Sequence, residues 1–251
     1  MPGWMEAGGW GLLAGSALLV GSAVGYLVRL PRRVVASVMA FGAGVLLSAV
    51  AFDLISDAYE QGGLTPTVLG AVAGAVAYTG CNVVLAWRGA RHRKRSGGQQ
   101  PSEDEQAGSG TALALGALLD GIPESVVIGA SLLGGGAVSA ATVVAVFVSN
   151  VPEGLSSAAG MRRAGRSPTY VFGLWTVIAL ISGLAAVVGY TLLGGVSPLV
   201  LAAVTAVAGG AILTMIADTM VPEAFDEAHL ATGLILLVGF LGAFSISVSG
   251  R

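Results

Sequence analysis

The sequence predicts an all-α membrane protein with eight transmembrane helices in a single transmembrane domain, residues 1–251. Three observations lead to this prediction. Hydrophobic residues make up 55% of the 251-residue chain and charged residues only 10%. The mean hydropathy is +0.83, well above that of soluble globular domains. Apolar segments also recur at the length of roughly 20 residues that a spanning helix needs.

The apolar segments can be placed in order along the chain. The chain starts MPGWMEAGGW, which carries Glu6 and no lysine or arginine before the first apolar segment. Because the basic region of a cleaved signal peptide is missing, we keep this segment as a span. Windows of about 19 residues then give eight spans in all: 9–29, 35–56, 65–87, 111–134, 137–160, 170–193, 198–221 and 229–249.

One polar segment divides the spans into three and five. Residues 88–110, RGARHRKRSGGQQPSEDEQAGSG, are charged and rich in glycine and serine, which predicts a flexible cytoplasmic loop between the third and fourth helices. Some transporters are built from inverted repeats. The second span ends FDLISDAYE and the seventh ends ADTMVPEAFDE, a weak likeness. A 3+2+3 inverted-repeat bundle is therefore a hypothesis.

The basic residues indicate how the chain is oriented. Eleven of the twelve lie after spans one, three and five, and the loops after spans two, four and six contain none. The positive-inside bias places the odd-numbered loops in the cytoplasm and both termini outside. We expect a multi-pass protein of a bacterial or archaeal cell membrane. The eleven residues are Arg29, Arg32, Arg33, Arg88, Arg91, Arg93, Lys94, Arg95, Arg162, Arg163 and Arg166.

Several acids lie within or near the ends of the predicted spans, where no lysine, arginine or histidine can pair with them: Asp53, Asp120, Glu124, Glu153 and Asp218. A lone charge at the bilayer centre costs at least about 2.5–3.5 kcal/mol, so uncompensated acids need a reason. We expect them to be protonated or to hold a cation.

Two segments, LLDGIPESVVIG and VFVSNVPEGLSS, each place a glutamate directly after a proline. Asp120 and Glu124 are four residues apart and share one helix face, as do Ser149 and Glu153, with Asn150 beside them. Each proline also frees the carbonyl four residues earlier. Carboxylates, carbonyls and small polar side chains suit a hard cation. The two acid-bearing faces are therefore expected to share one ion.

Simpler interpretations of the acids stay open. Asp53 would be merely solvated if it lies at the outer interface with Asp57 and Glu60. Glu223, past the seventh span, would lie in a wet loop with Asp226. The central acids would be protonated and hydrogen-bonded between helices in a purely structural role. On the transport interpretation, Asp53, Asp218 and Glu223 line the ion path.

With eight spans, a loop after the third and proline–glutamate motifs in the fourth and fifth, the chain resembles the ZIP (Zrt/Irt-like) metal transporters. Family motifs H-N-x-P-E-G and H/Q-x-x-P-E-G correspond here to D-G-I-P-E-S and S-N-V-P-E-G. The resemblance implies transport of zinc, iron or manganese into the cytoplasm. It implies the metal ligands Asp120, Glu124, Ser149, Asn150 and Glu153, and Asp218 on the path.

The departures from the family pattern concern the metal. Gly121 replaces an asparagine, and Ala186 occupies the place of a sixth-helix glutamate, so a second metal site looks degraded. Asp120 and Ser149 replace histidine or glutamine. Nitrogen ligands favour zinc, whereas an all-oxygen set suits manganese, magnesium or calcium, so zinc specificity is not implied.

The leading hypothesis is thus a divalent-metal carrier with the metal ion as substrate and no organic cofactor. Alternatives are a proton- or solute-conducting carrier and a non-transporting ZIP-like sensor or subunit. An intramembrane hydrolase using Asp120 and Asp218 is disfavoured because the chain has no G-x-S-x-G, H-E-x-x-H or G-x-G-D motif. We therefore expect no enzyme activity and no nucleic-acid partner. The expected partners are the lipid bilayer and metal ions, and a homodimer stays open.

Overall fold

A computed structural model describes residues 2–134 and 140–249, which are helical apart from the connections, the longest being residues 91–108, and contain no strand. Three of the described helices continue into π-helical stretches, Val50–Ile55 after α2, Ala86–Ala90 after α4 and Ile216–Met220 after α8. The α-helices are α1 (Gly3–Leu27), α2 (Arg32–Ala49), α3 (Ser56–Gly62), α4 (Leu64–Leu85), α5 (Ser109–Ser131), α6 (Ala140–Arg163), α7 (Pro168–Leu193), α8 (Pro198–Met215), α9 (Val221–Ala228) and α10 (Thr232–Ser249).

The predicted all-α membrane protein is confirmed. Within the described residues, seven helical stretches are long and apolar enough to cross a membrane, and each coincides with a predicted span. The remaining predicted span, 137–160, corresponds to α6, which is 24 residues long. The first residues of that prediction, 137–139, lie outside the described residues.

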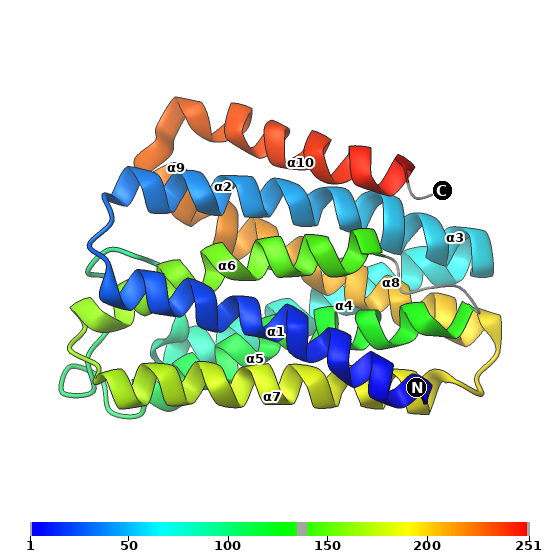
Figure 1. The fold of residues 1–251 in the computed structure, drawn as a ribbon, viewed down its shortest axis with the longest axis horizontal. Coiled ribbons are helices and arrows are strands. Elements are labelled where there is room, and N and C mark those ends of the chain that lie inside the picture. The colour runs from blue at the N-terminus through cyan, green and yellow to red at the C-terminus, as the bar shows by residue number, and fades with distance from the viewer. Residues whose placement is uncertain (1, 135–139, 250–251) are drawn as a thin grey trace.

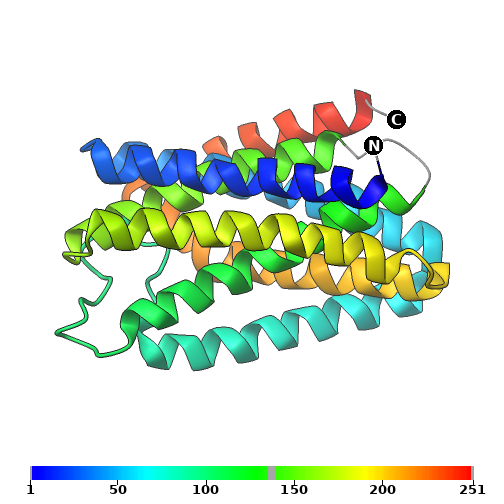
Figure 2. The same ribbon diagram turned by 60° about the horizontal axis from the view of Figure 1, so that its bottom comes forward.

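The helices form an elongated bundle (Figure 1). The connections from α1 to α2 and from α6 to α7 lie at the end opposite the N-terminus, and so does the segment between α4 and α5 (Figures 1 and 2). These are the three arginine-rich segments. The start of α1 and the end of α10 lie at the other end of the bundle (Figure 1). The basic loops therefore share one face, as the alternation along the sequence predicts.

Helix packing repeats between the first three and the last three spans. α4 packs along α8, and α10 packs along α2. If the last three spans repeat the first three, α8 corresponds to α2 and α10 corresponds to α4. The α4–α8 pair then corresponds to the α10–α2 pair. α1, which would correspond to α7, packs along it. This arrangement is the one that the hypothesis of a 3+2+3 inverted repeat requires.

Glycines allow these paired helices to approach closely. A β-carbon on Gly44 of α2 would lie 1.9 Å from the Leu236 carbonyl oxygen of α10, and one on Gly239 of α10 would lie 2.2 Å from that of Phe41. The α4–α8 pair repeats the contact at Gly74 and Gly210, whose β-carbons would lie 1.9 Å from Val207 O and 2.0 Å from Ala71 O. In each pair the facing residues have the same three-residue spacing. Small residues permit such contacts in lipid, where apolar burial does not drive association.

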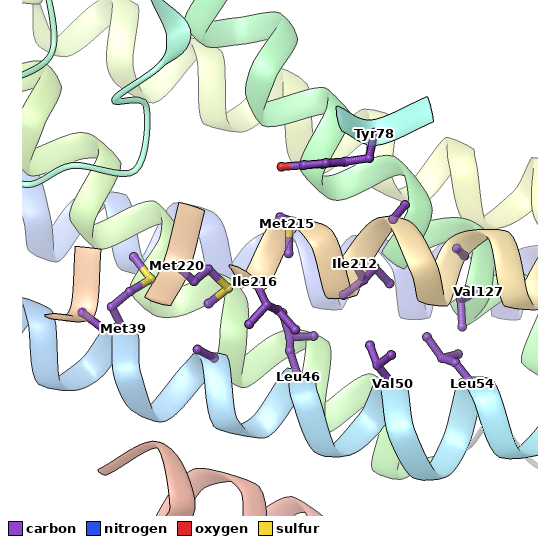
Figure 3. Packing of buried hydrophobic residues seen from close by; sticks show 14 of the residues in the cluster. Met39, Leu46, Val50, Leu54, Tyr78, Val127, Ile212, Met215, Ile216 and Met220 are labelled. Atoms are coloured by element: carbon purple, nitrogen blue, oxygen red, sulfur yellow. The ribbon is translucent and has the colours of Figure 1, made fainter. Parts of the chain in front are cut away.

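The largest apolar cluster lies between α2 and α8 (Figure 3). Met39, Leu46, Ile212 and Met215 belong to it, and Tyr78 of α4 lies at its edge. This cluster therefore joins α2 and α8 and brings a phenol to the middle of the bundle.

Candidate cation site

The three central acids are buried in the middle of the bundle. Asp120 and Glu124 of α5 are 1% and 2% exposed, and Glu153 of α6 is 4% exposed. Pro123 and Pro152 lie within their helices, just before the two glutamates. Both helices continue through the proline, which removes a backbone hydrogen bond next to the acids. The sequence-predicted acids are thus inside the protein and away from lipid.

The expectation that these acids lack a basic partner was wrong. The segment between α4 and α5 inserts Arg93 and Lys94 into the bundle, where they are 2% and 3% exposed. Both residues belong to the polar segment that the sequence places outside the spans. A search for partners within the spans therefore missed them. The positive charges that pair with the acids therefore belong to a loop that folds back between the helices.

Lys94 bridges the two acid-bearing helices. Its Nζ lies 2.9 Å from Glu153 Oε2 of α6 and 3.4 Å from Asp120 Oδ2 of α5. The helices themselves pack mainly on other partners, α5 along α7 and α6 along α1. Acids from α5 and α6 thus meet at one cation, which is the arrangement expected of a shared ion, but the cation is an ammonium group of the chain.

Arg93 is held more rigidly than Lys94. Its Nε and Nη2 donate to the two oxygens of Asp120 at 2.8 Å each, and its Nη1 donates to Asn82 Oδ1 at 2.7 Å. Tyr78 donates its hydroxyl to Asp120 Oδ1 at 2.7 Å. Burial opposes the charge on Arg93, but the adjacent Asp120 carboxylate outweighs it and raises the pKa of the guanidinium. A bidentate pair of this kind fixes the geometry of both groups.

Further hydrogen bonds hold the inserted segment in place. Ser96 donates its backbone N–H and its hydroxyl to Glu223 Oε1, at 2.8 and 2.5 Å. The Gln100 amide donates to the carbonyls of Arg93 and Ser157 at 3.0 and 3.2 Å. Ser156 of α6 bonds the Lys94 carbonyl. Glu223 therefore anchors the loop and is only 4% exposed, so the alternative of a wet loop was wrong for this residue.

A second tie holds the far end of the same loop. Glu103 accepts hydrogen bonds from Arg166 Nη1 at 2.6 Å and from the backbone N–H of Gly110 at 3.1 Å. The hydrogen bond from Arg166 and those from the backbone lower the pKa of Glu103 to about 2. The loop is thus tied at both ends of residues 93–110. Its predicted flexibility stays a prediction.

The charges in the site do not cancel. Two basic side chains, Arg93 and Lys94, face three carboxyl groups. Glu124 interacts electrostatically with Glu153, Lys94 and Asp120, yet its buried Oε1 has no hydrogen-bond partner. A buried polar atom without a partner is costly, by roughly 1–3 kcal/mol. Among the three acids of this site, Glu124 is thus the one with a buried oxygen that has no hydrogen-bond partner in the protein.

The remaining predicted ligands have protein partners. Ser149, 1% exposed, donates to Val146 O of its own helix at 2.9 Å. The Asn150 amide donates to Ala14 O of α1 at 2.9 Å. Within the described residues, no three His, Cys, Asp or Glu side chains are grouped so as to hold a metal ion. Asp120 and Glu153 instead contact the Lys94 ammonium.

Gly121 and Ala186, the two positions that the resemblance connects with a second metal site, carry no polar side chain. Ala186 of α7 is fully buried, and its methyl group would lie 2.6 Å from a β-carbon on Gly11 of α1. The α7 side chain that faces Gly121 is Ser182, whose Oγ would lie 3.8 Å from a β-carbon there. Neither position places a second carboxylate beside Glu124.

A cavity lies on either side of the central acids. The cavity towards the termini has a volume of about 240 Å³ and is lined by Asp53, Asp57, Thr142 and Val127, the last being one helical turn from Glu124. Asp53 is 8% exposed and accepts from the Ser247 hydroxyl at 2.6 Å. It is therefore buried at a cavity wall, and the interpretation as a merely solvated acid was wrong.

The cavity towards the basic loops has a volume of about 320 Å³ and is lined by Lys94, Asp218 and Thr219. Asp218 is exposed and lies in the π-helical stretch of the seventh span, as Asp53 lies in that of the second. π-helical stretches are rare and frequently occur at functional sites. Asp120, by contrast, is committed to Arg93 and Tyr78.

Sequence reasoning missed Tyr78, Arg93, Lys94 and Ser156. One signal was present, because Lys94 is the only lysine of the chain and stands in the middle of a basic run. That signal could not distinguish a cytoplasmic charge that orients the protein in the membrane from a basic side chain that is buried against the acids. No family model matches the chain, and a search of curated proteins found no similar protein.

Proposed function

We propose that the protein carries divalent metal cations across the membrane through the acids between α5 and α6. The observation that carries this proposal is the buried Glu124 Oε1, which has no hydrogen-bond partner and lies among further carboxyl groups. A protein that only needed a stable core would place apolar residues here, since buried ionised groups seldom stabilise a fold. An unsatisfied carboxylate beside other carboxylates suits a hard cation.

The two cavities support a path through this site. Val127 at the wall of one cavity is one helical turn from Glu124, and Lys94 at the wall of the other contacts Glu153. Asp53 and Asp218 place one acid in each cavity. An ion would thus meet a carboxylate before, within and after the central site. Buried acids in membrane helices typically mark ion pathways.

The direction and the metal are inferred from the sequence. The basic loops share the face with the larger cavity, so the positive-inside bias makes that cavity cytoplasmic. Uptake into the cytoplasm is what the resemblance to ZIP transporters implies. The resemblance to ZIP transporters supports zinc, iron or manganese as the class of substrate. The oxygen-rich ligand set supports manganese as a good competitor of zinc.

Uptake into proteoliposomes tests the proposal. We expect the wild type to accumulate Mn²⁺ or Zn²⁺ and the variants Glu124→Gln and Glu153→Gln to lose uptake, because an amide keeps the shape but removes the charge that offsets dehydration of the dication. Glu6→Gln is the matched control, since Glu6 is exposed in the first turn of α1 and should tolerate the same change. Unchanged uptake in both core variants would make the acids structural.

A non-transporting sensor or subunit is the second candidate. The observation that favours it is the pairing of Asp120 and Glu153 with Arg93 and Lys94, which already supplies two positive charges to the site. Such a protein would bind metal without passing it. Binding measured in detergent with no flux in proteoliposomes would support this candidate over the carrier.

A further inference from the structure

We infer that Lys94 is a tethered cation that holds the metal site when no ion is bound, so that the ammonium group and a divalent ion occupy the acids in turn. The inference rests on the proposed function and adds its regulation. Three features of the described residues support it: the position of the ammonium, the contacts that hold it and the chain on either side of it.

The first feature is position. Lys94 Nζ contacts acids from both α5 and α6, which are the two helices that bear the proposed ligands. The same residue also lines the larger cavity, together with Asp218 and Thr219. Lys94 therefore lies at the boundary between the site and this cavity. An ion bound to Glu153 would have to displace the ammonium, and it would leave past the same residue.

The second feature is the way the ammonium is held. Arg93 directs four hydrogen bonds at Asp120, Tyr78 and Asn82. Lys94 Nζ, in contrast, contacts one oxygen each of Asp120 and Glu153, at 3.4 and 2.9 Å. An ammonium is a point charge on a flexible stem, whereas a guanidinium binds a carboxylate in a fixed fork. Arg93 is thus expected to remain bound to Asp120, whereas the Lys94 ammonium can be replaced by a divalent ion.

The third feature is the chain around Lys94. It stands on a connection and not on a spanning helix, and Gly97 and Gly98 lie a few residues further on. The nearby backbone is held by side chains of Ser156 and Gln100, which lie outside the acid cluster. The lysine side chain can therefore swing towards the larger cavity while its neighbours keep their hydrogen bonds.

Exchange has a measurable effect on affinity. The apparent dissociation constant of a ligand rises in proportion as the competent state becomes less populated. If the ammonium holds the site for about nine-tenths of the time, the apparent metal affinity is about tenfold weaker than that of the open site. Lys94 would thereby also keep the site neutralised between transport cycles.

The single lysine makes the exchange directly observable. An amine-reactive reagent can be applied to the full-length protein in detergent, with and without Mn²⁺, and the adduct on Lys94 quantified by mass spectrometry. Lys94 is 3% exposed, so we expect little adduct without metal and at least a fivefold increase with saturating Mn²⁺. Glu124→Gln, which should not bind the ion, serves as the control and should show no increase.

A variant tests the competition independently. Lys94→Met keeps the length of the side chain and removes its charge, and we expect it to bind Mn²⁺ at least about tenfold more tightly than wild type. Arg88→Met removes an exposed charge from the same segment and should leave the affinity unchanged. If Lys94→Met does not fold, the labelling of Lys94 in the wild-type protein still tests whether Mn²⁺ displaces the ammonium.

The outcomes separate this inference from the proposed function. Binding of Mn²⁺ by wild type without any gain of Lys94 labelling would overturn the exchange and leave metal binding standing. Metal binding of equal strength in wild type and Lys94→Met would do the same. Absence of binding of both Mn²⁺ and Zn²⁺ to wild type and to Lys94→Met would overturn the proposed function, and the inference with it.

Discussion

Arg93 and Lys94 are neighbours with similar burial, yet their contacts differ. Arg93 Nε and Nη2 bind both oxygens of Asp120 at 2.8 Å, while Lys94 Nζ reaches Asp120 and Glu153 through ionic contacts at 3.4 and 2.9 Å. The difference arises from the two head groups, a planar fork and a compact ammonium. At the scale of the residue, Arg93 fixes the loop to Asp120, and Lys94 offsets the negative charge of the carboxylates in the site.

The Arg93–Asp120 pair should be important for stability. Arg93→Met leaves Asp120 buried without its main partner, which typically destabilises a protein by about 3–5 kcal/mol. We expect a clear fall in the unfolding temperature of the protein in detergent. The double variant Arg93→Met, Asp120→Asn should be more stable than the single one, because it removes the unpaired charge as well.

Arg88→Met is the control for this measurement, since Arg88 is exposed on the same segment. A single variant at Arg93 that unfolds at the wild-type temperature would show that Tyr78 and Lys94 alone suffice to hold Asp120.

The sequence predicted the acids of this site well and their partners poorly. Asp120, Glu124 and Glu153 stand out because charged residues are rare in apolar segments. Nothing in the local pattern around Arg93 and Lys94 distinguishes a buried base from the cytoplasmic charges that orient a membrane protein. Their burial depends on hydrogen bonds to α6 and α9, such as those of Ser156 and Glu223, which are distant in sequence.

At the scale of the element, glycine contacts set how closely the helices pack. The reciprocal contacts of Gly44 with Leu236 and of Gly239 with Phe41 bring the α2 and α10 backbones together, and Gly74 and Gly210 do so for α4 and α8. From sequence these glycines were indistinguishable from the many others in the spans. Helix positions could be predicted because hydropathy is local, but the partners in packing could not.

Substitution of one contact glycine should disrupt its helix pair. Gly239→Val would place side-chain atoms against the carbonyl of Phe41, where even a β-carbon comes to 2.2 Å. We expect lower yield and a lower unfolding temperature than for Gly242→Val on the same helix, because a β-carbon on Gly242 meets nothing within 4 Å. Equal stability of the two variants would contradict the described packing of α10 on α2.

At the scale of the whole molecule, the two halves repeat one arrangement around α5 and α6. Each half contributes a helix with a π-helical stretch that carries an aspartate, Asp53 in one and Asp218 in the other. Each of these aspartates lines a cavity on its own side of the central acids. A repeated frame around a central ion site is the architecture of several families of secondary transporters. The weak likeness of FDLISDAYE and ADTMVPEAFDE thus acquires a structural counterpart.

The proposed transport depends on a divalent ion binding among the carboxyl groups of Glu124 and Glu153. An anomalous difference map from crystals of the wild-type protein grown with Mn²⁺ would locate that ion. We expect one strong peak at roughly 2.0–2.6 Å from oxygens of both glutamates, with the Lys94 ammonium withdrawn from Glu153. A peak only at Asp53 or Asp218, or no peak while Lys94 still contacts Glu153, would contradict this binding site.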